Sequence, residues 1–154
     1  MKMHTYEVNL KWTDNTKGIL SSPVLPQNIE VSTPPDFPKG IPGIWSPEHL
    51  FIASINSCVM STFLNIAENS KLHFISFECK SSCTVDLVEG AYVITEVILH
   101  PRVVIPYSQK PDRAKRIVEM SEKACLVSNT LKIPIRLEPE IIVEKSPIPI
   151  SESF

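Results

Sequence analysis

The sequence predicts an α+β fold with the element order β-β-β-α-β-β-α-β. Three observations lead to this fold class. A long helical segment without charges fills the centre of the chain, period-two patterns typical of strands lie on both sides of it, and a second helical pattern follows the later strands. The length of 154 residues suits one domain with a sizeable core. We expect this single domain to cover residues 1–145 and a loose tail to cover residues 146–154.

The N-terminal region predicts a meander of short strands. They are expected at residues 5–13, 19–22 and 28–32. The first alternates strictly, which indicates a half-buried strand, and its apolar face is Tyr6, Val8, Leu10 and Trp12. A turn is expected at residues 14–18, and a connector rich in proline and glycine, residues 33–45, leads into the central helix. Long connectors without secondary structure are often functional.

The central helix is expected over residues 46–70. Ser46 can cap its first N–H groups, Pro47 suits the first helical position, and Glu48 suits the positive end of the helix dipole. No further charge appears until Glu68, and apolar residues fall on nearly every face. Such a helix is typical of a buried core. Its uncharged length would just permit a membrane span, but polar residues interrupt it and no second such segment exists, so we interpret it as the core helix of a soluble protein.

The second half of the chain predicts a hairpin, a helix and a last strand. The elements are expected at residues 75–87, 92–105, 111–125 and 133–143. Glu89-Gly90 forms the hairpin turn, and Pro111 opens the second helix. One face of that helix consists of Ala114, Ile117, Val118, Ser121 and Cys125. Pro134 and Pro139 imply an edge or a break in the last strand.

Composition excludes several function classes. A net charge of −2 and a pI near 6.1 give no electrostatic basis for binding nucleic acid or an anionic membrane. The N-terminus has no apolar signal-peptide region, so we expect a cytoplasmic protein whose four cysteines are thiols rather than structural disulfides. No cofactor is expected.

The cysteines differ in their surroundings. Cys79 and Cys83 lie on one face of a strand but about 13 Å apart at about 3.3 Å per residue, so they cannot share a metal or a bond and are expected to be core thiols. Cys58 lies at the middle of the central helix and Cys125 in the last turn of the second helix. There the helix dipole disfavours a thiolate, which makes Cys125 a poor first nucleophile but an adequate disulfide partner.

Two sequence blocks resemble a known family. SPEHLFIASINSC, which holds Glu48 and Cys58, is similar to the first block of the OsmC/Ohr family, the osmotically inducible and organic hydroperoxide resistance proteins. ACLVSNTLK, which holds Cys125, is similar to the second block. The resemblance implies an OsmC-like fold, an intertwined homodimer with central helices packed together, and a site at the subunit interface. It also implies that Cys58 attacks the peroxide, that Cys125 resolves the product, and that Glu48 holds a nearby arginine.

The chain departs from the family pattern at the activating cation. Family peroxidases use an arginine from the N-terminal strands, whereas this chain has no arginine before Arg102. Lys17 lies in the corresponding turn and could supply a point charge, with Arg113 or Arg116 as alternatives from the second helix. Glu48 and Cys58 would also be about 15 Å apart on an unbroken helix. They can share a site if the helix breaks, if a third residue links them, or if a partner chain intervenes.

The leading hypothesis is therefore a thiol peroxidase that reduces organic hydroperoxides and is regenerated by a small dithiol or a lipoyl-bearing protein. An apolar wall would favour organic peroxides, with Phe51, Ile55, Met60 and Phe63 as candidates, although by default the same side chains are simply core residues. The alternative is a non-enzymatic dimer with the same fold that binds an apolar ligand or senses redox state, and the missing arginine supports it. A peroxiredoxin of thioredoxin type does not fit, because the chain lacks an alternating βαβ order.

Overall fold

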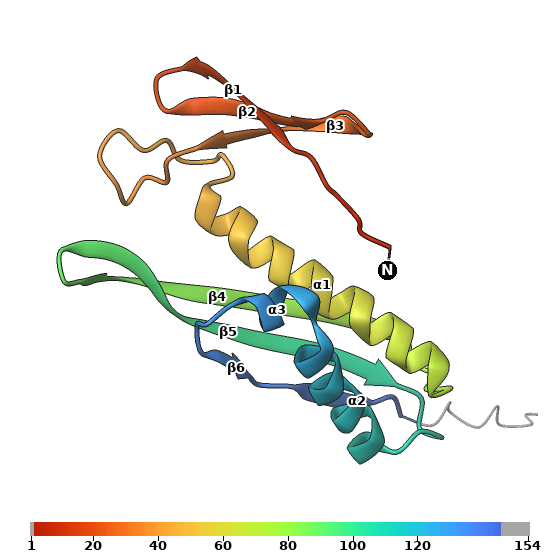
Figure 1. Cartoon of the computed structure of the whole chain (residues 1–154). Helices are drawn as coiled ribbons and strands as arrows, with labels where there is room; N and C mark the ends of the chain where they lie inside the picture. Colours follow the sequence, from red (N-terminus) through yellow and green to blue (C-terminus); the bar gives the residue numbers. More distant parts are fainter. Residues whose placement is uncertain (1, 146–154) are drawn as a thin grey trace, which may run out of the picture. The chain divides into compact units, whose positions relative to one another are not determined.

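The computed structural model describes residues 2–145, so the expected tail at residues 146–154 lies outside the described part of the chain. The chain divides into two compact units, Met1–Phe51 and Ile52–Phe154. The strands are β1 (Asn9–Asp14), β2 (Lys17–Ser22), β3 (Leu25–Ser32), β4 (Ser76–Val88), β5 (Ala91–Ile105), β6 (Ile135–Leu137) and β7 (Glu140–Val143). The helices are α1 (Pro47–Asn69), α2 (Pro111–Ala124) and α3 (Leu126–Thr130) (Figure 1).

The first unit is an antiparallel meander in the order β1-β2-β3. Its connector closes back on β3, where the Ser32 N–H donates to the Trp45 carbonyl at 2.9 Å. The expected half-burial of the first strand is wrong for this chain, since Leu10 is 66% and Trp12 is 71% exposed. The structure also starts β2 at Lys17, which the sequence assigned to the preceding turn.

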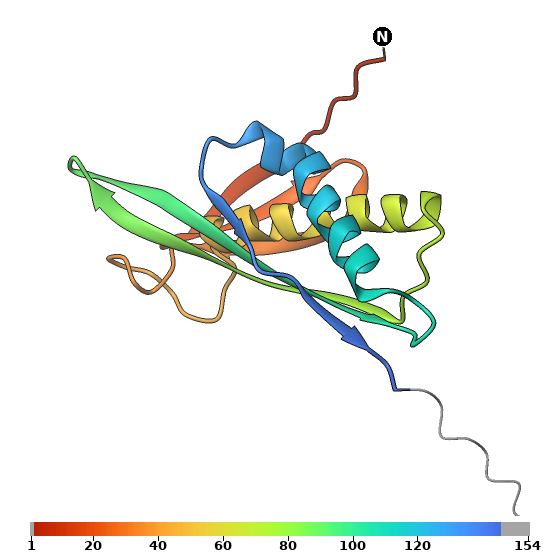
Figure 2. The same cartoon turned by 90° about the horizontal axis from the view of Figure 1, so that it is seen from below.

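The second unit is a four-stranded sheet with helices on one face. β5 pairs with β4 in antiparallel fashion and with both β6 and β7 in parallel (Figures 1 and 2). The predicted last strand is broken at Pro139, as its prolines implied. Opposite this break stands the fully buried Pro101 of β5, which has no N–H to donate and lies between the stretches that pair with β6 and with β7.

One hydrophobic core joins the helices to the sheet. Buried side chains come from α1, α2 and β5 and include Phe63, Ala67, Ala114, Ile117, Val118, Val103 and Ile105. Phe63 stacks on Phe77 with ring centroids 4.7 Å apart and meets the edge of Phe74. The face of α2 expected from its periodicity is buried, since Ala114, Val118 and Ser121 are 0% exposed. The opposite face of the sheet carries exposed ion pairs such as Arg136 with Glu138.

The central helix is less buried than the sequence suggests. Within α1 the buried row is Ile55, Val59, Phe63 and Ala67, spaced by four residues as one helical face requires. Met60 and Leu64 are each 41% exposed. Among residues 2–145, α1 is the one helix long and apolar enough to cross a membrane. Because its buried row packs into the core described above, we interpret it as a core helix, in agreement with the sequence.

Candidate functional site

Cys58 and Cys125 come from separate elements and meet in the second unit. Cys58 is half-buried at the middle of α1, and Cys125 is fully buried between α2 and α3. Cys125 has extended backbone angles, φ −65° and ψ 119°, which end α2. It then caps α3, where its sulfur accepts from the Ser128 N–H at 3.5 Å and its carbonyl accepts from the Asn129 N–H at 2.9 Å. The sequence did not predict α3.

The thiols of Cys58 and Cys125 interact with each other, and their pKa values move in opposite directions. Burial raises the pKa of Cys58, but hydrogen bonds from the Cys125 thiol, the Val127 and Leu126 N–H groups and the Thr62 hydroxyl outweigh it, so its pKa lies below the ordinary value. Burial, followed by the hydrogen bond to Cys58, raises the pKa of Cys125. Cys58 is therefore the thiol that ionises first.

This asymmetry assigns the two thiols different chemistry. A thiolate is the nucleophile, so Cys58 is the residue able to attack an electrophile. Cys125 beside it can then displace hydroxide from the oxidised Cys58 sulfur, and the proton that the Cys125 thiol loses leaves with the hydroxide as water. The sequence expected Cys125 to resist ionisation because of the C-terminal dipole of its helix. The structure gives a different cause, because Cys125 lies beyond the end of α2 and its raised pKa comes from burial and from Cys58.

Glu48 lies in the first turn of α1, away from Cys58. α1 is continuous from Pro47 to Asn69, so the two side chains are about 15 Å apart along its axis and a break in the helix cannot join them. The Glu48 Oε2 atom is buried and has no hydrogen-bond partner among the described residues. A buried carboxylate oxygen without a hydrogen-bond partner costs folding free energy. A further hydrogen-bond donor at this atom would therefore be stabilising.

The start of α1 is capped as the sequence predicted. The Ser46 side chain accepts from the His49 N–H at 3.2 Å, and the His49 Nδ1 atom lies 2.6 Å from the Ser46 hydroxyl. The same imidazole contacts the edge of Trp45, with ring centroids 6.1 Å apart. His49 therefore completes a reciprocal cap like that of a capping box, with an imidazole in place of the usual carboxylate.

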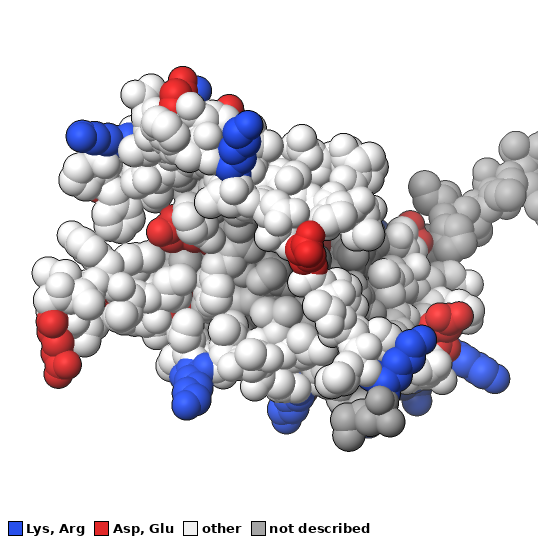
Figure 3. Space-filling model, turned by 45° about the horizontal axis from the view of Figure 1, so that its top comes forward, with Lys and Arg blue, Asp and Glu red and all other residues white. Residues whose placement is uncertain are grey.

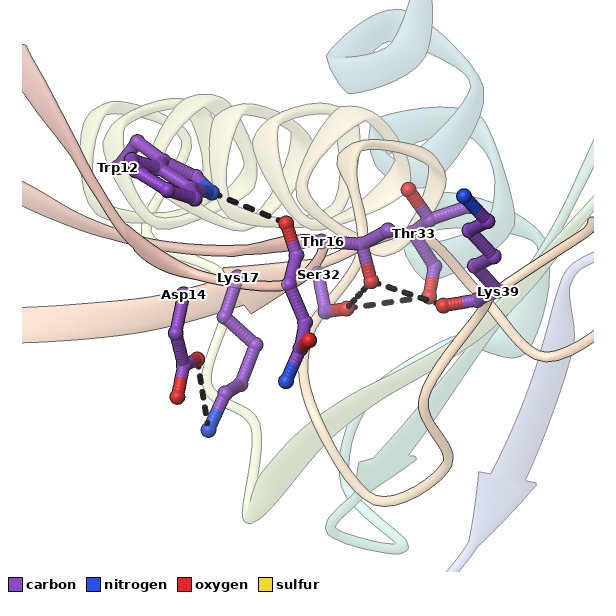
Figure 4. A network of polar contacts seen from close by, with 8 residues as sticks. Trp12, Asp14, Thr16, Lys17, Ser32, Thr33 and Lys39 are labelled. Atoms are coloured by element: carbon purple, nitrogen blue, oxygen red, sulfur yellow. Dashed lines mark hydrogen bonds and ion pairs between the residues drawn. The ribbon is translucent and has the colours of Figure 1, made fainter.

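Two of the three candidate cations are engaged elsewhere in the chain, and the third, Arg116, is an exposed residue of α2. Lys17 is ion-paired with Asp14 at 3.3 Å in the first unit (Figure 4). Arg113 donates to the Gln109 side chain and to the Ser70 carbonyl at the C-terminal end of α1. Since Ser70 follows Cys58 by twelve positions, Arg113 caps this helix at a distance from the thiol.

The two remaining cysteines lie on β4. Cys79 and Cys83 are partly buried, and burial raises the pKa of Cys79.

The described residues contain no group of three or more histidines, cysteines, aspartates or glutamates able to hold a metal. On the face seen in Figure 3, lysine and arginine side chains lie singly rather than gathered in a basic patch.

Comparison with known proteins gives the family. The model of the OsmC-like protein family matches residues 40–140. The chain belongs to the OsmC-like family. This confirms the resemblance noted in the sequence and the α+β fold class. No curated protein sequence matches the chain.

Solved structures show the same fold at low sequence identity. An OsmC-like protein of unknown function from Vibrio cholerae aligns with a TM-score of 0.80 and 19% identity over 89% of this chain and 99% of that one. An organic hydroperoxide resistance protein from Legionella pneumophila aligns with a TM-score of 0.74 and 18% identity over 93% of this chain and all (100%) of that one. The organic hydroperoxide resistance protein OhrB of Bacillus subtilis aligns with a TM-score of 0.67 and 16% identity, covering 90% and 98%.

Proposed function

We propose that this OsmC-like protein is a cysteine-based peroxidase that reduces organic hydroperoxides. The observation that carries the proposal is the Cys58–Cys125 pair. Burial raises the pKa of Cys58, but several hydrogen bonds lower it below the ordinary value, whereas burial, followed by the hydrogen bond to Cys58, raises the pKa of Cys125. Similar structures named organic hydroperoxide resistance proteins support the substrate class. We also propose that the protein is cytoplasmic, where thiols such as its four free cysteines are kept reduced.

The proposed reaction cycle has three steps. The Cys58 thiolate attacks the distal peroxide oxygen, the O–O bond breaks, and the leaving alkoxide takes a proton to give an alcohol and Cys58 sulfenic acid. The Cys125 thiol then attacks the Cys58 sulfur, which forms a disulfide and releases water. An external dithiol, either small or lipoyl-bearing, reduces this disulfide by exchange and restores both thiols.

Glu48 and Lys17, which both belong to the first unit, are the other residues that we propose for the reaction. Glu48 has an unpartnered buried oxygen, and Lys17 is held by an exposed carboxylate, Asp14. Exposed ion pairs are worth about 0–1 kcal/mol, so Lys17 can leave Asp14 at little cost. We propose that Glu48 orients a cation toward the reacting atoms and that Lys17 is that cation. Because α1 is unbroken, a linking residue or a partner chain must bring them to Cys58.

The proposed apolar wall needs a correction. Ile55 and Phe63 are 0% exposed and pack into the core, so they cannot contact a substrate. Met60 is open, and it lines a cavity of about 310 Å³ with Ala53, Phe77 and Cys79. Preference for an organic peroxide would therefore depend on surfaces other than the buried face of α1.

The rate of Cys58 oxidation tests the proposal against the non-enzymatic alternative. We expect cumene hydroperoxide to oxidise Cys58 at pH 7 at least about a hundred-fold faster than it oxidises a small free thiol, because the thiolate fraction is larger and the site positions the peroxide. Stopped-flow mixing with mass detection of the Cys58 peptide measures this. A rate equal to that of the free thiol would favour a binding or sensing module.

We also predict a homodimer. Leu10, Trp12, Met60 and Leu64 are large apolar side chains that lie exposed, and apolar surface of this kind can form a subunit contact. Family resemblance implies that central helices pack together, which would cover the open side of α1. Sedimentation velocity at micromolar concentration should show a species of twice the 17.3 kDa chain mass. A stable monomer under these conditions would contradict the prediction.

A further inference from the structure

Thr62 lies one helical turn after Cys58 and is half-buried beside it. Its hydroxyl donates to the Cys58 carbonyl at 2.8 Å. Ser57 and Ser61 make the same type of bond on α1, to the carbonyls of Ala53 and Ser57. Of these three hydroxyls, that of Thr62 is also one of the groups that lower the pKa of the Cys58 thiol. The spacing of four residues could have revealed this neighbour in the sequence.

The Thr62 hydroxyl has one proton and two acceptors within reach. The Cys58 carbonyl already accepts the N–H of the following helical turn, so it keeps a partner when the hydroxyl turns away. A thiolate is a stronger acceptor than a carbonyl, because hydrogen bonds to charged groups are about twice as strong as neutral ones. Ionisation of Cys58 therefore favours rotation of the hydroxyl from the carbonyl to the sulfur.

Local donors matter at this position, because Lys17 and Arg113 are engaged with other groups. Cys58 lies at the middle of a helix of 23 residues, where the helix dipole has little effect. The candidate cation Lys17 is paired with Asp14, and Arg113 caps the C-terminal end of α1. The other local donors are the Cys125 thiol and the Val127 and Leu126 N–H groups. The thiol is consumed when it resolves the oxidised Cys58, so Thr62 is the side-chain donor that remains.

We propose that the Thr62 hydroxyl is a catalytic hydrogen-bond donor that holds the Cys58 thiolate, taking over part of the role of the arginine that this chain lacks. This assignment rests on the proposed peroxidase function. Thr62 would act before the peroxide arrives and again after the disulfide is reduced, when the thiolate forms anew.

Alkylation of Cys58 with iodoacetamide as a function of pH tests the assignment without any peroxide. Thr62→Val keeps the branched shape and removes the hydroxyl, so we expect the pH midpoint of Cys58 alkylation to rise by about one unit, a ten-fold loss of thiolate. Thr62→Ser keeps the donor and should restore the midpoint. Ser61→Ala is the matched control on the same helix, and it should leave the midpoint unchanged.

The outcomes separate the assignment from the proposed function. A wild-type midpoint in Thr62→Val, or an equal shift in Ser61→Ala, would overturn the role of Thr62. If Thr62→Val fails to fold by circular dichroism, Thr62→Ala gives the same readout with the same expected shift. Lys17→Met in the same titration measures how much Lys17 contributes to the pH midpoint of Cys58 alkylation. A shifted midpoint in a protein that reduces no hydroperoxide would sink the peroxidase proposal and leave the Thr62 contact standing.

Discussion

Cys58→Ser should abolish hydroperoxide reduction. A serine hydroxyl fits the half-buried position but does not ionise at neutral pH, so it cannot attack the O–O bond. We expect consumption of cumene hydroperoxide in the presence of dihydrolipoamide to fall at least about a thousand-fold, to the rate without protein. An end-point assay of remaining peroxide over the pH range 6–8 measures it.

Cys79→Ser is the matched control for this loss. Cys79 is a partly buried thiol whose pKa is raised, and we assign it no role in the reaction. Its replacement should leave the rate within about two-fold of wild type. If Cys58→Ser retains activity while Cys79→Ser loses it, the nucleophile is misassigned and the chemistry belongs to β4.

Cys125→Ser should stop the reaction after the first chemical step. The serine hydroxyl can still donate to Cys58, so the first oxidation should proceed at a rate close to that of wild type. No thiol then remains beside Cys58 to displace hydroxide from its sulfur. We expect about one sulfenic acid per chain, trapped by dimedone, and oxidation to the sulfinic acid when peroxide is in excess.

Cys125→Ala separates the two roles of Cys125. It removes the hydrogen bond as well as the resolving thiol, so the pH midpoint of Cys58 alkylation should rise in this variant and stay near wild type in Cys125→Ser. Equal midpoints in the two variants would mean that the Cys125 thiol does not stabilise the Cys58 thiolate. A disulfide that still forms in Cys125→Ser would assign resolution to another cysteine.

Local signals in the sequence were enough for most of the elements and for several of their ends. Ser46 and Pro47 fix the start of α1 through side-chain capping and a missing N–H, both of which act within one turn. The apolar face of α2 followed from its helical spacing, because a single helix buries one stripe. Pro139 marked the break between β6 and β7, since proline cannot donate to a sheet.

The surroundings of the thiols depend on contacts between elements, which no local pattern contains. Cys125 was expected at the end of a helix, whereas an extended backbone at this residue starts α3 and turns its sulfur toward Cys58. Trp12 was expected to be covered and is open, because strand periodicity shows which side chains share a face but not what packs against that face. The pairing of Lys17 with Asp14 likewise depends on where β2 begins.

The most direct test of the proposed reaction is to map the disulfide formed by one equivalent of cumene hydroperoxide. The reduced protein is oxidised at pH 7, alkylated, digested without reductant and analysed by mass spectrometry. We predict one intramolecular bond between Cys58 and Cys125, with Cys79 and Cys83 alkylated and therefore still reduced, and dihydrolipoamide should reverse it. A bond between Cys79 and Cys83, or four alkylated cysteines after peroxide treatment, would contradict the proposal.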